Sequence, residues 1–161
     1  MTLLPKTCFF SGHRHISSDD AARVKSRLNE ELLNAVNAGY THFISGGAIG
    51  FDTLAAEQVV RLREDYSDIR LILYLPCTDH TKNWNENDRM RFDAISSFAD
   101  EIYYVSETAY SDGCMKKRNN AMTEAADLCI AYLKNTVSGT AQTVKIAEKK
   151  GLKIINIADS D

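Results

Sequence analysis

The spacing of apolar residues changes repeatedly along the chain, and it predicts alternating helices and strands. Within residues 17–39, apolar side chains recur every four positions, as they do in a helix that buries one stripe; they are Val24, Leu28, Leu32 and Val36. Ser17 or Ser18 can cap the start of this helix, and Gly39 can end it. Residues 69–76 form instead an almost unbroken apolar run, which is typical of a strand covered on both faces.

The same patterns over the whole chain predict strands at 6–12, 41–45, 69–76, 101–105, 127–133 and 153–157. Helices are predicted between them, at 17–39, 51–66, 83–99, 113–126 and 139–151. This alternation predicts an α/β fold: one domain over residues 1–161, with a Rossmann-like, doubly wound parallel sheet and helices on both faces. We expect the strand order 3-2-1-4-5-6, with a simpler wound sheet as the alternative.

Composition and charge narrow the class of protein. The chain has 161 residues, of which 44% are apolar and 25% charged, as in an ordinary globular domain. Its net charge of −3 argues against nonspecific binding of nucleic acid over a broad face. We expect no membrane contact, because no apolar run is long enough to cross a bilayer and the first ten residues do not resemble a signal peptide. Cys8 and Cys129 lie in strand-like runs as expected buried thiols, which favours the cytoplasm.

Two glycine-bearing turns follow predicted strands: "SGGAIGFD" at 45–52 and "VSGTAQT" at 137–143. In the expected order, strands one and four flank the point where the strand order reverses, and strands two and five lie one place further out. Ligands of such sheets bind beyond the carboxyl ends of the strands at that point. The two turns would face each other there, and because each opens a helix, each could hold a phosphate. The alternative is that the glycines serve only the close packing of helix and strand.

Two arginines would enter the same crevice, Arg14 from the loop after strand one and Arg118 from the fourth helix. A guanidinium offers paired donors in a fixed plane, which suits a phosphate. The expected ligand-binding residues are therefore Gly12, His13, Arg14, Gly46, Gly47, Gly50, Asp52, Arg118, Asn119, Ser138, Gly139 and Thr140.

Four motifs occur in order, each after an expected strand: "GHR", "SGGAIGFDTLAAE", "MKKRNNAM" and "SGTAQTVKIAEKKGLKIINI". Together they resemble the YpsA-like branch of the SLOG superfamily, over about residues 6–157. That superfamily has a Rossmann-like fold and also contains the DNA-processing protein DprA and the LOG phosphoribohydrolases. The resemblance implies that the chain binds a nucleotide or a nucleotide-derived ligand, and it supplies no settled reaction.

One position departs from the LOG pattern. Arg118 falls on the motif arginine of these enzymes, but Thr143 stands where their glutamate should be. Cleavage of a glycosidic bond needs a carboxylate, and a threonine hydroxyl is not ionised near neutral pH. LOG-type phosphoribohydrolase activity is therefore not expected. The nearest acids that could replace the glutamate are Asp52 and Glu57.

Several side chains have two interpretations. Asp52 could cap its helix or contact a ribose hydroxyl, and Glu57 could support the site or lie on the surface. His13 could bind a ligand or order its loop, and no metal site is expected. Trp84 and Tyr110 could fill apolar gaps or stack on a base.

Three classes of function remain, in this order. The first is a regulatory or sensor protein that binds a nucleotide-like small molecule, with NAD or an ADP-ribose-like compound among the candidates. The second is an enzyme that hydrolyses an N-glycosidic or phosphoester bond of such a ligand. The third is a DprA-like DNA-binding module, which the acidic balance disfavours. The sequence leaves the oligomeric state open and is compatible with a homo-oligomer.

Overall fold

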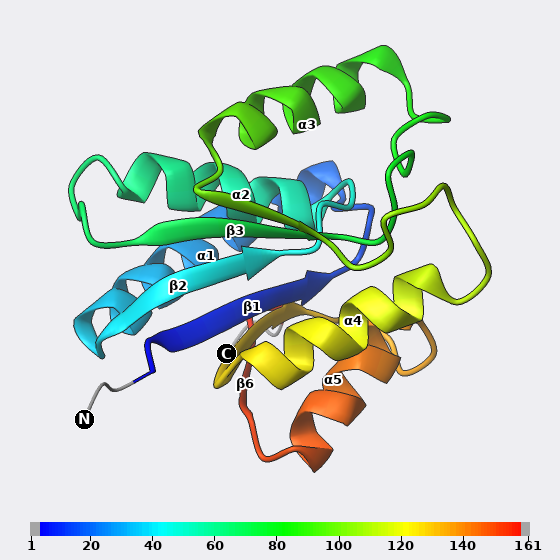
Figure 1. Cartoon of the computed structure of the whole chain (residues 1–161). Helices are drawn as coiled ribbons and strands as arrows, with labels where there is room; N and C mark the ends of the chain where they lie inside the picture. The colour runs from blue at the N-terminus through cyan, green and yellow to red at the C-terminus, as the bar shows by residue number, and fades with distance from the viewer. Residues whose placement is uncertain (1–3, 159–161) are drawn as a thin grey trace.

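The computed structural model describes residues 4–158, in which strands and helices alternate along the chain (Figure 1). The strands are β1 (Lys6–Gly12), β2 (Tyr40–Ser45), β3 (Arg70–Leu75), β4 (Glu101–Tyr104), β5 (Leu128–Tyr132) and β6 (Lys153–Asn156). The helices are α1 (Ser18–Asn37), α2 (Phe51–Leu62), α3 (Glu86–Phe98), α4 (Cys114–Ala125) and α5 (Gly139–Lys149). The predicted elements are all present, and the α/β class is confirmed.

The six strands form one parallel sheet in the order β4-β3-β2-β1-β5-β6. The expected order 3-2-1-4-5-6 is therefore wrong, because β4 pairs with β3 at the edge and β5 takes the place beside β1. The burial of the two strands gives the physical reason. All five residues of β5 are buried, as a central strand requires, whereas all four residues of β4 are exposed. The strand order reverses between β1 and β5.

Helices cover both faces of this sheet (Figure 1). One core joins α1, α2 and α3 to side chains such as Phe10, Phe43 and Leu73. The other core joins α4 and α5 to the opposite face, through side chains such as Phe9 and Ile44. Because α4 leads from the edge strand β4 to the central strand β5, it crosses the sheet and reaches the point where the strand order reverses.

Caps account for where two helices begin. The Ser17 side chain accepts a hydrogen bond from the Asp20 N–H, so Ser17 is the cap of α1. Asn85 caps α3 in the same way, with 2.8 Å between its Oδ1 and the Asp88 nitrogen. The prediction that this helix starts at residue 83 was therefore wrong, and Trp84 lies in the turn before it.

The expected burial of Cys8 and Cys129 is confirmed, and both are free thiols. No helix between residues 4 and 158 is long and apolar enough to cross a membrane.

Candidate functional site

A cavity of about 310 Å³ lies at the carboxyl edge of the sheet, where the strand order reverses. Its walls come from the end of β1 and the loop after it, the first turn of α2, the middle of α4 and the start of α5. Of the twelve ligand-binding residues expected from the sequence, all but Gly46, Gly47 and Gly50 line it. Its lining residues are Phe10, Ser11, Gly12, His13, Arg14, Ala48, Asp52, Met115, Arg118, Asn119, Met122, Ser138, Gly139, Thr140 and Thr143.

Arg118 is the most constrained charged group of this cavity. Only 5% of it is exposed. Its Nη1 donates to the carbonyl of Gly46, and its Nε donates to Asn119 Oδ1 over 2.7 Å. These two contacts fix the plane of the guanidinium, and no hydrogen bond or ion pair between residues 4 and 158 engages its Nη2. Burial lowers the pKa of Arg118, and the nearby Asp52 opposes this shift.

Asp52 is the buried acid of the cavity, in the first turn of α2. Its Oδ2 accepts a hydrogen bond from the Ala48 N–H over 3.3 Å. Burial raises the pKa of Asp52 to about 6, although Arg118, the Ala48 N–H and Arg14 each act to lower it. Asp52 thus exchanges its proton close to neutral pH, which is where a buried group can act as an acid or a base.

The start of α5 supplies backbone donors to the cavity. Ser138 caps the helix, because its Oγ accepts a hydrogen bond from the Ala141 N–H over 3.0 Å. The N–H groups of Gly139 and Thr140 have no partner between residues 4 and 158, and both residues line the cavity. A Cβ at Gly139 would meet nothing within 4 Å, so the approach to these groups is open. Free N–H groups at a helix start are suited to an anion.

Thr143 also lines the cavity, one turn into α5. It is 2% exposed, and its hydroxyl donates to the Gly139 carbonyl over 3.0 Å. The residue that replaces the LOG glutamate thus faces the cavity, with its only proton engaged by the helix backbone.

The glycines of the turn at 45–52 lie outside the cavity lining. A Cβ at Gly46 would lie 2.7 Å from Arg118 Nη1, and one at Gly47 would lie 2.5 Å from Leu75 Cδ2. Gly50 lies against the backbone of Arg14, whose carbonyl oxygen would be 2.2 Å from a Cβ there. Gly47 and Gly50 also have positive φ angles, of 72° and 79°. Close packing therefore accounts for all three glycines, and Ala48 and Asp52 are the parts of this turn that face the cavity.

The loop after β1 contributes two different side chains. Nε2 of His13 accepts a hydrogen bond from the Lys134 N–H over 2.8 Å, so the ring helps to order the loop after β5. Burial, and secondly the charge of Lys134, lower the pKa of His13. Because Nε2 accepts this hydrogen bond, the neutral ring carries its proton on Nδ1. Arg14 is exposed at the mouth of the cavity.

A second cavity, of about 610 Å³, shares the Arg14, Ala48, Met115 and Arg118 wall with the first. Trp84 and Tyr110 both line it, together with residues of the loop after β3. His80 also lines this cavity, and it was not among the residues expected from the sequence. Its Nε2 lies 3.2 Å from the Gly47 carbonyl oxygen, and its ring meets the Trp84 ring edge to face at 5.3 Å. The sequence offered one signal for His80, because the segment "CTDHTKNW" that contains it directly follows a predicted strand.

Glu57 does not reach either cavity. It forms a two-point ion pair with Arg91 of α3, with distances of 2.6 and 3.0 Å between side-chain oxygens and nitrogens. Of the two interpretations of Glu57, the place on the surface therefore describes its position in the fold. Between residues 4 and 158, no group of three or more histidine, cysteine, aspartate or glutamate side chains is arranged to hold a metal ion.

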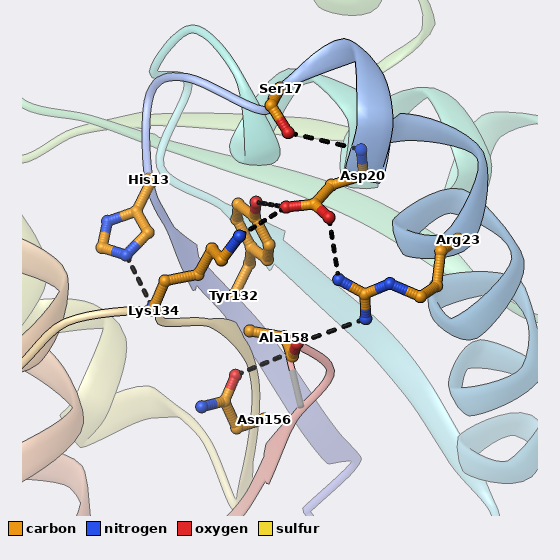
Figure 2. Close-up of polar contacts among 8 residues, drawn as sticks. All are labelled: His13, Ser17, Asp20, Arg23, Tyr132, Lys134, Asn156 and Ala158. Atoms are coloured by element: carbon orange, nitrogen blue, oxygen red, sulfur yellow. Dashed lines mark hydrogen bonds and ion pairs between the residues drawn. The ribbon is translucent and has the colours of Figure 1, made fainter. Parts of the chain in front are cut away.

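A polar network is centred on Asp20, at the start of α1 (Figure 2). Asp20 accepts hydrogen bonds from the Tyr132 hydroxyl at 3.2 Å and from Lys134 Nζ at 2.6 Å, and it pairs with Arg23 at 3.1 Å. Arg23 also donates to the Ala158 carbonyl over 3.2 Å. Lys134 and, secondly, Arg23 hold the pKa of Asp20 well below its usual range. The network joins α1, the end of β5 and the segment after β6.

Comparison with known proteins supports the same fold. The Helicobacter pylori DNA processing protein A, for which a single-stranded DNA binding mode is described, has a TM-score of 0.67 at 19% identity, over 93% of this chain and 64% of that protein. DprA of Streptococcus pneumoniae gives 0.65 at 17% identity, over 93% of this chain and 49% of that protein. This chain thus spans about half to two thirds of these proteins.

Sequence comparison finds relatives in Staphylococcus and Bacillus species. UPF0398 protein SH1465 of Staphylococcus haemolyticus is 28% identical in an alignment of 148 positions that covers 87% of this chain and 79% of the relative. UPF0398 protein BCB4264_A1614 of Bacillus cereus is 29% identical over 130 residues, or 80% of this chain and 71% of the relative. Residues 12–157 match the YpsA model, which describes the YspA SLOG family. Because this match covers most of the chain and all the residues that line the cavity except Phe10 and Ser11, the protein belongs to the YpsA SLOG family.

Proposed function

We propose that the protein binds a phosphorylated, nucleotide-like ligand in the cavity between β1 and β5, in a regulatory or sensor role. The observation that carries this proposal is the pairing of a buried, fixed guanidinium with free helix N–H groups in one cavity. Arg118 leaves Nη2 free, and the Gly139 and Thr140 N–H groups lie in the same lining. Each of these groups is a donor, and a phosphate is made only of acceptors.

The balance of charge in the cavity favours a ligand with few charges. A buried anion needs a full counter-charge, because helix ends carry only partial charge. Arg118 supplies one such charge inside the cavity, and Arg14 supplies a second at its mouth. Asp52 opposes both when it is ionised. A phosphodiester or pyrophosphate therefore suits the cavity better than a triphosphate.

The second cavity extends the proposal to a ligand with two parts. Arg14 and Arg118 belong to the wall that the cavities share, so a phosphate there could join a sugar in one cavity to a ring in the other. Trp84 offers an aromatic surface in the second cavity, and aromatic rings are common partners of bases. ADP-ribose and NAD both have a pyrophosphate between two larger groups. These considerations support them over a mononucleotide.

Titration calorimetry on the wild-type protein tests this proposal with adenosine, AMP, ADP-ribose and NAD. We expect adenosine to bind at least about tenfold more weakly than AMP, because a charge-assisted hydrogen bond contributes about 1.5–3 kcal/mol. ADP-ribose or NAD should bind more tightly than AMP if both cavities are used. Equal affinity for adenosine and AMP would contradict the placement of the phosphate, and failure of all four ligands to bind would contradict the proposal.

An enzymatic role is the second candidate, and Asp52 is the observation that favours it. A buried carboxyl with a pKa near 6, beside an arginine in a cavity, resembles a general acid or base. Any ligand that binds should be incubated with the protein and its products separated by chromatography. Turnover by the wild type that Asp52→Asn abolishes would favour the enzyme, whereas intact ligand after long incubation would favour the sensor.

DNA binding is a third candidate, supported by the fold similarity to DprA alone. The net charge of −3 counts against it. A gel-shift series with a single-stranded oligonucleotide at rising salt tests it. Binding that weakens steeply with salt would favour this candidate, and no binding at low salt would exclude it.

A further inference from the structure

Strand β4 is an exposed, apolar edge of the sheet. It lies at the end of the strand order, so only β3 pairs with it. Three of its four residues are large and exposed: Ile102 by 42%, Tyr103 by 53% and Tyr104 by 41%. Proteins usually protect such an edge with lysine, proline or a bulge, and β4 has none of these. Its only charged residue is Glu101.

The backbone of β4 has a defined outward side. The Val105 N–H donates to the Leu75 carbonyl of β3 over 2.8 Å. Alternate residues of a regular strand turn their N–H and C=O groups to the same side, so Tyr103 also turns toward β3. Ile102 and Tyr104 then turn theirs to the open edge. Val105 directly follows the strand, and its bond fits the register in which Leu75 pairs with Tyr104. The Asp100 N–H, which donates to the Leu71 carbonyl, precedes the strand and does not fit that register.

We propose that β4 pairs with β4 of a second copy of this chain, antiparallel about a twofold axis, with Tyr103 opposite Tyr103 of the second copy. In this register Ile102 and Tyr104 lie opposite Tyr104 and Ile102 of the other strand. Both outward-turned residues then exchange backbone hydrogen bonds with the second copy. The two six-stranded sheets become one continuous sheet across the axis.

The side chains match in this register. Tyr103 lies on the same face as Tyr74, to which its ring is 5.1 Å away, so four tyrosines would gather at the axis. On the other face, Ile102 of each copy would pack against Tyr104 of the other, an aromatic and β-branched pair that stabilises sheets. Glu101 would face Val105. A register with Glu101 at the axis would instead place two negative charges opposite each other. In a register with Ile102 at the axis, only one pair of outward-turned residues would exchange backbone hydrogen bonds.

Analytical ultracentrifugation and cross-linking test this dimer. For the wild type we expect a dimer fraction that rises over about 1–100 μM protein, because the interface is small. Ile102→Pro should shift the protein to monomer, since proline removes only an outward N–H and edge strands tolerate it there. Ile102→Val should behave as wild type. Circular dichroism on each variant establishes that it is folded.

A cysteine at the axis tests the register directly. In the proposed pairing the Tyr103 Cα atoms would be about 4.5 Å apart, within the range of a disulfide. Oxidised Tyr103→Cys should therefore run as a covalent dimer, and Tyr66→Cys, an exposed tyrosine outside β4, should not. The four native cysteines are buried and should not contribute. A small interface should still form a dimer at a protein concentration of about 100 μM, so a wild-type protein that is monomeric at this concentration would overturn the proposal. A dimer that Ile102→Pro leaves intact and that Tyr103→Cys does not cross-link would also overturn it.

Discussion

Arg118 Nη1 and Asp52 Oδ2 lie 2.7 and 3.0 Å from the point that a Cβ at Gly46 would occupy. The two opposite charges thus approach each other across a residue that has no side chain. Both are buried, and each acts on the pKa of the other against the effect of burial. Gly46 is therefore required by the charged centre of the cavity, although it does not line the cavity itself.

Replacement of Arg118 tests the proposed phosphate position. We expect Arg118→Ala to weaken a phosphorylated ligand about ten- to a hundredfold, and the matching nucleoside much less, because one charge-assisted hydrogen bond is lost. Arg118→Lys should recover only part of the affinity, since an ammonium cannot make the paired planar contact. Calorimetry with AMP and adenosine on the three proteins measures this. Equal losses for both ligands would show that Arg118 supports the fold instead.

Asp52 predicts how ligand affinity depends on pH. An anionic ligand should raise the pKa of Asp52 further, so binding takes up a proton and affinity should rise as the pH falls through about 6. We expect the affinity to rise about three- to tenfold from pH 7.5 to pH 5.5. A tenfold rise corresponds to an increase of about one unit in the pKa of Asp52 when the ligand binds. ADP-ribose is the suitable probe, because its pyrophosphate keeps its charge over this range. In Asp52→Asn the affinity should not change with pH, and a wild-type slope that survives this substitution would point to another group.

The same pKa shift affects the stability of the protein without ligand. Since the folded state holds the Asp52 proton more tightly than the unfolded state, the free energy of unfolding should fall as the pH rises from about 4 through about 6. Urea denaturation across this range should show a smaller fall for Asp52→Asn than for wild type. His13 and His80, whose pKa values burial lowers, act in the opposite direction in both proteins. A difference between wild type and Asp52→Asn that does not change with pH would therefore contradict the raised pKa of Asp52.

Two glycine substitutions separate packing from ligand contact. Gly47→Ala should lower the free energy of unfolding by about 1–3 kcal/mol, because the residue has a positive φ and Leu75 occupies the space of its Cβ. Ligand affinity of the folded fraction should not change. Gly139→Ala is the matched control: its Cβ would meet no protein atom, so stability should hold, and reduced affinity would show that the ligand closely approaches α5.

Asp20 predicts an acid-dependent contribution to stability. Asp20→Asn should lower the melting temperature at pH 7, because Lys134 and Arg23 lose their common partner. The lowered pKa of Asp20 means that this stabilisation is complete above about pH 4 and is lost as the pH falls below it. The difference between the two proteins should therefore shrink in scanning calorimetry below pH 4. A constant difference would show that the network acts through packing rather than charge.

Thr143 predicts that AMP is not cleaved. Its hydroxyl donates to the backbone of α5 and offers no carboxylate to activate water or to stabilise a charged ribose. Chromatography of AMP incubated with the protein should show no free adenine above the uncatalysed background. Release at an ordinary enzymatic rate would show that another acid, with Asp52 as the nearest, performs the reaction.

The sequence by itself predicted the alternating elements, because the spacing of apolar residues follows directly from which faces are buried. The stripe in α1 and the continuous apolar run of β3 are the clearest examples. It also identified most of the cavity. Arg118, Asp52 and the start of α5 follow predicted strands, and in a parallel sheet the segments after the strands meet at one edge whatever the order of the strands.

Only the tertiary structure decided which strands are neighbours and which side chains pack against the glycines of the turn at 45–52. Spacing along the chain does not encode pairing across the sheet, so the edge position of β4 depended on the burial of β5 beside β1. The roles of Gly46 and Gly47 depended on Arg118 and Leu75, which approach them from distant segments. The partner of Glu57 likewise comes from a contact between residues far apart in sequence, for which local pattern carries no signal. For His80 the sequence offered only its position after a predicted strand, and the contact with Gly47 comes from the fold.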